Sequence, residues 1–119
     1  MTERRFGGPP AYPLSKQTEF VSNLDRLRET SDAVADAFRG LRRAADAHGS
    51  LDHKQRELCM LAGFAATRNE GGFRVHCTRA VDAGASVRDL EQVVILMLGT
   101  SLGLVPVVEA LRWVHDELG

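Results

Sequence analysis

The segment that decides the fold is RNEGGFRVHCTRAVDAG, residues 68–84. Two adjacent glycines, Gly71 and Gly72, interrupt one helical pattern, and a second pattern begins at about Phe73 and stops at Gly84. Glycine pairs favour turns, and a glycine just after the last periodic residue commonly ends a helix. The stretch therefore predicts a helix-turn-helix hairpin with its turn at the glycine pair.

The residues before this hairpin also have helical periodicity. Apolar positions recur every three or four residues from about Lys16, and Ser31 or Asp32 is the expected N-cap of a second helix that stops near Gly49. A third helix is expected from Asp52 to about residue 68. It is apolar on nearly every face, which predicts that other protein layers, including a second copy of the chain, cover it.

Two further helices are expected after the hairpin. Ser86 and Asp89 form an S-x-x-D capping box, which predicts the start of a fifth helix. Pro106 is typical of the first position of a sixth helix. No alternating strand pattern occurs in the sequence. The predicted fold class is all-α, with about six helices around a helix-turn-helix core in an oligomeric bundle.

The composition indicates one soluble globular domain. The chain has 119 residues, of which 44% are hydrophobic and 26% charged, with a formal net charge of -1. This charge predicts no nucleic-acid partner. Without an apolar signal segment or a stretch long enough to span a membrane, we expect a cytoplasmic protein with no membrane partner. Residues 1–14 contain three prolines and predict an extended or mobile arm, followed by a helical domain over residues 15–119.

Two polar residues occupy apolar helix faces and are therefore candidates for chemistry. His76 shares a face with Phe73 and Ala80, so it is either a core histidine bonded to a carbonyl or an acid-base group. Glu57 lies at the inward edge of the third helix and needs a partner, since an isolated buried carboxylate is costly. The alternative for Glu57 is a salt bridge to a neighbouring Lys54 or Arg56. In a straight hairpin turning at Asn69 to Gly72, Glu57 would lie on the order of 10 Å from His76.

Other candidates have simple structural explanations. Glu70 precedes the fourth helix, where an acid favours the positive end of the helix dipole. Cys59 and Cys77 do not form a C-x-x-C pair, so they are expected to be buried small side chains, with a redox role as the alternative. His48, His53 and His115 are scattered and expected to be solvated. No nucleotide motif or metal-binding motif occurs, so no cofactor and no metal is expected.

The segments LDHKQREL and RNEGGFRVH, followed by Ala80, Gly84, Ser86 and Leu90, resemble the carboxymuconolactone decarboxylase family, which includes alkylhydroperoxidase D-like proteins. The resemblance runs from Leu51 to the C-terminus. It implies an all-helical trimer or hexamer without a cofactor. In the peroxidase branch, a C-x-x-C pair precedes a histidine, and a glutamate lies nineteen residues before that histidine.

The resemblance carries over only part of each branch's site. Glu57 and His76 have the relay spacing of the peroxidases, but Asn69 and Gly72 stand where the two thiols would be. The decarboxylase segment R-E-x-E-x-R-x-H keeps Glu70, Arg74 and His76, whereas its second acid has become Gly72. A histidine that decarboxylases often carry in the fifth helix falls on Leu96 or Met97.

These features favour a decarboxylase-like lyase acting on a small carboxylated or lactone-like substrate. The resemblance implies that His76 is the general acid or base, that Glu57 orients it and that Glu70 takes part in catalysis. Arg74 would bind a substrate carboxylate. The alternatives are a peroxidase that uses Cys77 or Cys59 and a non-catalytic oligomeric binder of small molecules. The sequence does not identify the substrate.

Overall fold

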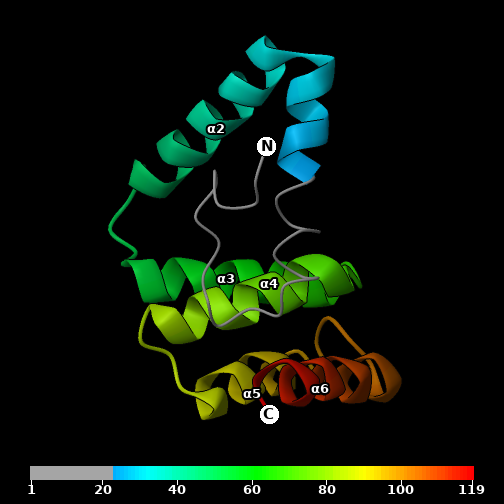
Figure 1. The fold of residues 1–119 in the computed structure, drawn as a ribbon. Helices are drawn as coiled ribbons and strands as arrows, with labels where there is room; N and C mark the ends of the chain where they lie inside the picture. The colour runs from blue at the N-terminus through cyan, green and yellow to red at the C-terminus, as the bar shows by residue number, and fades with distance from the viewer. Residues whose placement is uncertain (1–22) are drawn as a thin grey trace. The chain divides into compact units, whose positions relative to one another are not determined.

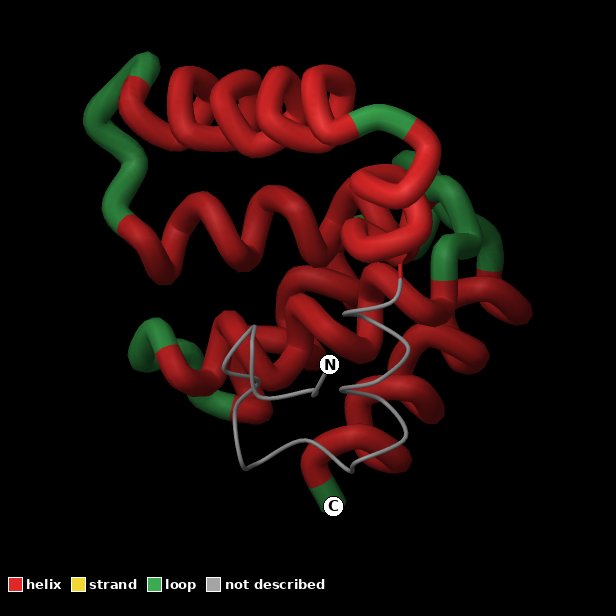
Figure 2. The backbone as a smooth tube through the Cα atoms, turned by 45° about the horizontal axis from the view of Figure 1, so that its top comes forward, coloured by secondary structure: helices red, strands yellow, loops and turns green. Residues whose placement is uncertain are grey.

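The computed structural model describes residues 23–119, and within them every regular element is a helix (Figure 2). The chain divides into two compact units between Ser50 and Leu51. The described helices are residues 23–30, α2 (Asp32–Ala47), α3 (His53–Ala66), α4 (Glu70–Asp82), α5 (Val87–Leu96) and α6 (Leu104–Leu118). The all-α prediction is confirmed. The predicted arm at residues 1–14 and the predicted helix start at Lys16 lie outside the described residues.

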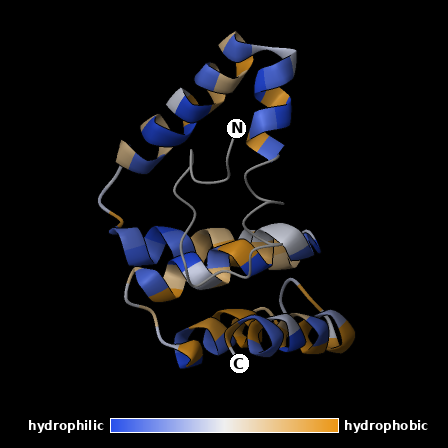
Figure 3. Cartoon of the chain, viewed as in Figure 1, coloured by the Kyte–Doolittle hydropathy of each residue, from blue (hydrophilic) through white to orange (hydrophobic). Residues whose placement is uncertain are grey.

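The first unit contains an amphipathic α2. Ser31 is its N-cap, as predicted, because the Ser31 hydroxyl accepts a hydrogen bond from the Val34 N–H at 3.1 Å. Hydrophilic and hydrophobic residues alternate around this helix (Figure 3). Its apolar stripe at Val34, Phe38 and Leu41 remains about half exposed.

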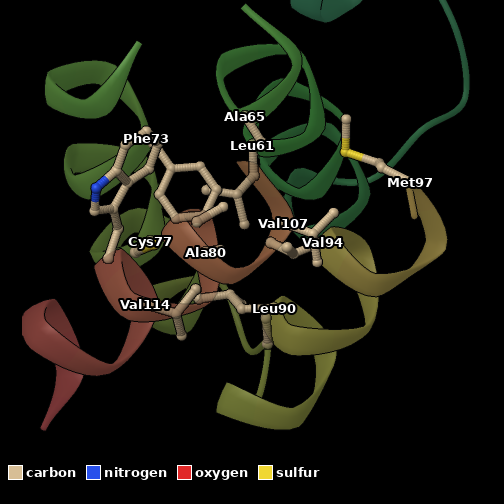
Figure 4. Close-up of a cluster of buried hydrophobic side chains, with 13 residues drawn as sticks. Leu61, Ala65, Phe73, Cys77, Ala80, Leu90, Val94, Met97, Val107 and Val114 are labelled. Carbon is tan, nitrogen blue, oxygen red and sulfur yellow. The ribbon is translucent and has the colours of Figure 1, made fainter. Parts of the chain in front are cut away.

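The second unit is built from two helical hairpins. The α3–α4 pair packs against the α5–α6 pair, with α4 against α6 and α3 against α5 (Figure 1). Buried side chains from all four helices fill the space between the hairpins (Figure 4). At one end of this core, the rings of Phe73 and Trp113 meet edge to face with centroids 5.5 Å apart. The remaining large, fully buried side chains are Leu61, Cys77, Leu90, Val94, Val107 and Val114.

The turn between α3 and α4 lies earlier than the sequence predicts. Helix α4 begins at Glu70, and Gly71 and Gly72 belong to its first turn. Asn69 caps the helix by accepting a hydrogen bond from the Gly72 N–H at 3.1 Å. The prediction of a turn at the glycine pair is therefore wrong, because the asparagine cap begins the helix before them.

The end of α3 explains why the turn needs no glycine. Arg68 has φ +60°, the left-handed conformation that usually selects glycine after a helix. The Asn69 N–H donates to the Phe64 carbonyl at 2.9 Å, and the Arg68 N–H donates to the Ala65 carbonyl at 3.1 Å. These two bonds form a Schellman motif. The Arg68 side chain forms an ion pair with Glu109 of α6, which holds this residue in place.

The other predicted helix ends are confirmed, with one correction. Asp52 and Ser86 each accept a hydrogen bond from the backbone three residues on, in complete capping boxes. Gly84 ends α4 with φ +107°. Pro106, however, is the third residue of α6 and not the first, because the helix begins at Leu104. A proline is tolerated throughout the first turn, where the N–H has no helical partner.

Candidate functional site

The structure brings Glu57 of α3 and His76 of α4 into direct contact. His76 Nδ1 lies 2.7 Å from Glu57 Oε1. Glu57 is buried, with 6% of its side chain exposed, and Thr78 is another buried polar residue. The His76 side chain is 12% exposed. The pair therefore joins an enclosed carboxylate to an imidazole that keeps an edge toward solvent.

This contact differs from the separation expected of a hairpin that turns at residues 69–72. Because the turn occupies residues 67–69, its centre moves by roughly two and a half residues, which shifts the residue facing His76 by about five. That shift removes on the order of 7 Å of axial separation. His76 then faces a position about one helical turn from Glu57, and the two side chains span the remainder.

Glu57 is ionised despite its burial. Burial raises the pKa of its carboxyl group, but the hydrogen bond and positive charge of His76, with smaller contributions from Arg79 and His53, lower the pKa more. The net pKa is below the ordinary value of 4.5. An ionised carboxylate only accepts hydrogen bonds, so His76 Nδ1 carries the hydrogen in this pair. When the imidazole is neutral, its free lone pair is therefore on Nε2.

The Nε2 atom of His76 takes no part in the contact with Glu57. Among the described residues no hydrogen-bond partner contacts it. In the same part of the chain, no fully buried side-chain nitrogen or oxygen lacks a partner. An unpartnered Nε2 therefore reaches the surface. The face of the imidazole packs against Phe64, with ring centroids 4.9 Å apart and planes tilted by 33°.

The model of the carboxymuconolactone decarboxylase family matches residues 32–116. This chain belongs to the carboxymuconolactone decarboxylase family. The match includes α2 and so begins nineteen residues before Leu51, where the resemblance seen in the sequence starts. No curated protein and no solved structure matches the chain.

Two charged residues that this family's pattern singles out lie away from the pair. Glu70 is exposed at the first turn of α4 and accepts a hydrogen bond from Arg74 Nε at 2.8 Å. Arg74 also lies within 4.0 Å of Asp116 and Glu117 in α6. It is about 200° around the helix from His76. Three carboxylates already surround this guanidinium, which leaves its predicted role in binding a substrate carboxylate without support.

The two cysteines have different environments. Cys77 is buried in the core, as predicted, whereas Cys59 is exposed on α3, so the prediction that it is buried is wrong. Neither forms a disulfide bond within residues 23–119. At the places of the peroxidase thiols, Asn69 caps α4 and Gly72 donates the capping hydrogen bond. Nothing in this arrangement favours dithiol chemistry.

Two residues near the pair were not predicted from sequence. His53 lies one turn before Glu57 on α3, and its Nε2 is 3.5 Å from Glu57 Oε2, although the side chain is 63% exposed. The i,i+4 spacing was the available signal. The two histidines take the place of Lys54 and Arg56, which had been the alternative partners of Glu57. Phe64 gave no separate signal, because it is one of many apolar residues in α3.

The described part of the chain contains no metal-binding cluster. No group of three or more His, Cys, Asp or Glu side chains within residues 23–119 is placed to hold a metal ion. In the same range, no helix is long and apolar enough to cross a membrane.

Proposed function

We propose that this protein is a cofactor-free acid-base enzyme that decarboxylates, or carries out a related lyase or isomerase step on, a small carboxylated or lactone-like substrate. The observation that carries the proposal is the hydrogen bond from His76 Nδ1 to the buried Glu57 carboxylate, which leaves Nε2 unpartnered. Family membership supports the same reaction class. We place the enzyme in the cytoplasm.

In the proposed reaction, His76 acts as the general acid. As the bond between the substrate carbon and its carboxylate breaks, carbon dioxide leaves and the electron pair passes to an adjacent carbonyl as an enolate. A protonated Nε2 stabilises this charge and then delivers its proton to carbon. Glu57 stabilises the imidazolium at the start of the step, and solvent returns a proton to Nε2 afterwards.

Self-association is part of the proposal. Large apolar side chains are exposed where α5 ends and α6 begins, in a stretch without charged residues from Val93 to Val108. A group of exposed apolar side chains of this kind is typical of a protein interface. We define the α5–α6 patch as the exposed residues Ile95, Leu96, Leu98, Leu104, Val105 and Val108.

The test is carbon dioxide release from a panel of carboxylated γ-lactones. We expect turnover by the wild type and a loss of about 10²- to 10⁴-fold in His76→Asn, because a general acid contributes a factor of this size. The matched control is His115→Asn. His115 also contacts a glutamate, Glu91, at 2.8 Å, but it lies on the exposed surface. Equal turnover by His76→Asn and the wild type would refute the proposed role, and binding of lactones without any turnover would favour a non-catalytic binder.

A further inference from the structure

Phe64 occupies the space beside Gly72. A Cβ atom built on Gly72 would lie 2.5 Å from Phe64 Cε1 and 2.6 Å from Cδ1, closer than such atoms approach in proteins. The neighbouring Gly71 is different, since its nearest contact would be Asn69 Oδ1 at 3.9 Å. Gly72 thus permits the aromatic ring to lie against the first turn of α4.

The same ring covers one face of the His76 imidazole. The two centroids are 4.9 Å apart, which places the ring of Phe64 beside the imidazole that carries the unpartnered Nε2. Phe64 itself is partly buried against the core, which fixes the position of the ring. The absence of a side chain at Gly72 therefore makes room for the ring of Phe64, and this ring packs against His76. We call the ring of Phe64 the Phe64 wall.

We propose that the Phe64 wall makes this site select a substrate whose body beside His76 is apolar and flat, and reject one that carries a second carboxylate there. The inference rests on the proposed function for the reaction class, and it adds the class of substrate. A carboxylate against the ring would lose hydration without gaining a partner. An aromatic or alkyl group in the same place gains contact with the ring instead.

The first test measures binding and needs no turnover. The probes are two γ-butyrolactones, one with a phenyl substituent and one with a carboxymethyl substituent, and neither carries the carboxylate that the reaction would remove. Titration is followed by the NMR shift of the His76 Hε1 proton and by calorimetry. For the wild type we expect the phenyl lactone to shift the His76 signal and to bind at least about tenfold more tightly.

Variants assign the preference to the aromatic wall. Phe64→Ala and the more conservative Phe64→Leu should each reduce the preference to less than about threefold. Phe38→Ala is the matched control, because it removes an exposed phenyl ring from α2 and should leave the preference unchanged. If Phe64→Ala does not fold, Phe64→Leu and the wild-type ratio still give the result.

The outcomes separate this inference from the proposed function. Preferred binding of the phenyl lactone without turnover of any carboxylated lactone would refute the proposed function and leave the inference intact. Tighter or equal binding of the carboxymethyl lactone would overturn the inference even if the enzyme is active. Absence of a shift at His76 with both probes would also overturn it, as would a preference that Phe64→Leu retains.

Discussion

At the scale of single residues, the site depends on one carboxylate that stays ionised inside the protein. Burial disfavours the charged form of Glu57. The hydrogen bond from His76 at 2.7 Å, together with the charges of His76, Arg79 and His53, offsets this effect. A neutral replacement would keep the shape of the side chain but remove the charge. The contact therefore both stabilises the fold and fixes which imidazole nitrogen is reactive.

Removal of this charge should give a pH-dependent loss of stability. Because the pKa of Glu57 is lower in the folded than in the unfolded chain, its stabilising contribution is present above the ordinary value of 4.5. It is lost as the pH falls through the folded pKa. Urea denaturation of the wild type and Glu57→Gln should show a difference in unfolding free energy at pH 7 that shrinks below about pH 4.5. A difference that stays constant or grows on acidification would contradict this assignment.

Glu57 and His76 could be predicted as candidates from the sequence, but the residues that surround them could not. Both were found because they are polar residues on apolar helix faces, and this signal is local. Phe64 could not be distinguished from other apolar residues of α3, since its role depends on the space left by Gly72 in another helix. His53 was expected to be solvated, and it is, but its contact with Glu57 depends on the rotamers of both side chains.

At the scale of elements, the decisive feature is the short connection between α3 and α4. The apolar periodicity of the sequence predicted the helices and their order, and the capping residues predicted most of the helix ends. The turn was misplaced because Arg68 adopts the left-handed conformation that the sequence would assign to a glycine. The true position, residues 67–69, is what brings α3 and α4 into the register that joins Glu57 to His76.

The two glycines of α4 should respond in opposite ways to alanine. Gly71→Ala should stabilise the protein by up to about 1 kcal/mol, because alanine favours a helix and the site has room. Gly72→Ala should destabilise it by about 1–3 kcal/mol, because the new methyl group displaces the ring of Phe64. Urea denaturation of both variants, and of Gly72→Ala in a Phe64→Ala background, measures these changes in the free energy of unfolding.

The double variant gives the contradicting outcome. With Phe64 removed, the methyl group at Gly72 has space, so the substitution should become about as favourable as Gly71→Ala. If Gly72→Ala is as stable as Gly71→Ala in the presence of Phe64, the ring does not depend on the glycine.

At the scale of the whole molecule, an oligomer was predicted from the sequence, but the structure places the exposed apolar residues on other helices than expected. The prediction relied on the apolar α3, yet much of this helix is covered by α4 and α5. Most of the large exposed apolar side chains of the second unit lie instead on the α5–α6 patch, where Val105 is 74% exposed. Which apolar residues stay uncovered depends on how the hairpins pack, and this cannot be obtained from the period of one helix.

Charge placed on the α5–α6 patch should dissociate the proposed oligomer. Val105→Lys puts an ammonium group where a second copy would pack, and a buried unpaired charge is strongly unfavourable. Light scattering coupled to size exclusion should show a mass of several chains for the wild type and a smaller assembly for the variant. Val81→Lys, at an exposed valine on α4 outside the patch, is the control and should keep the wild-type mass. A wild-type mass for Val105→Lys would exclude the patch as the interface.

Glu57 holds His76 with its hydrogen on Nδ1 and leaves Nε2 as the atom proposed to react. Long-range ¹H–¹⁵N correlation NMR of the neutral imidazole tests this directly, because it distinguishes the two tautomers. We predict that the wild type shows the Nδ1–H tautomer and that Glu57→Gln weakens this preference. An Nε2–H tautomer in the wild type would contradict the account, since Nδ1 would then have no hydrogen to donate to the Glu57 carboxylate.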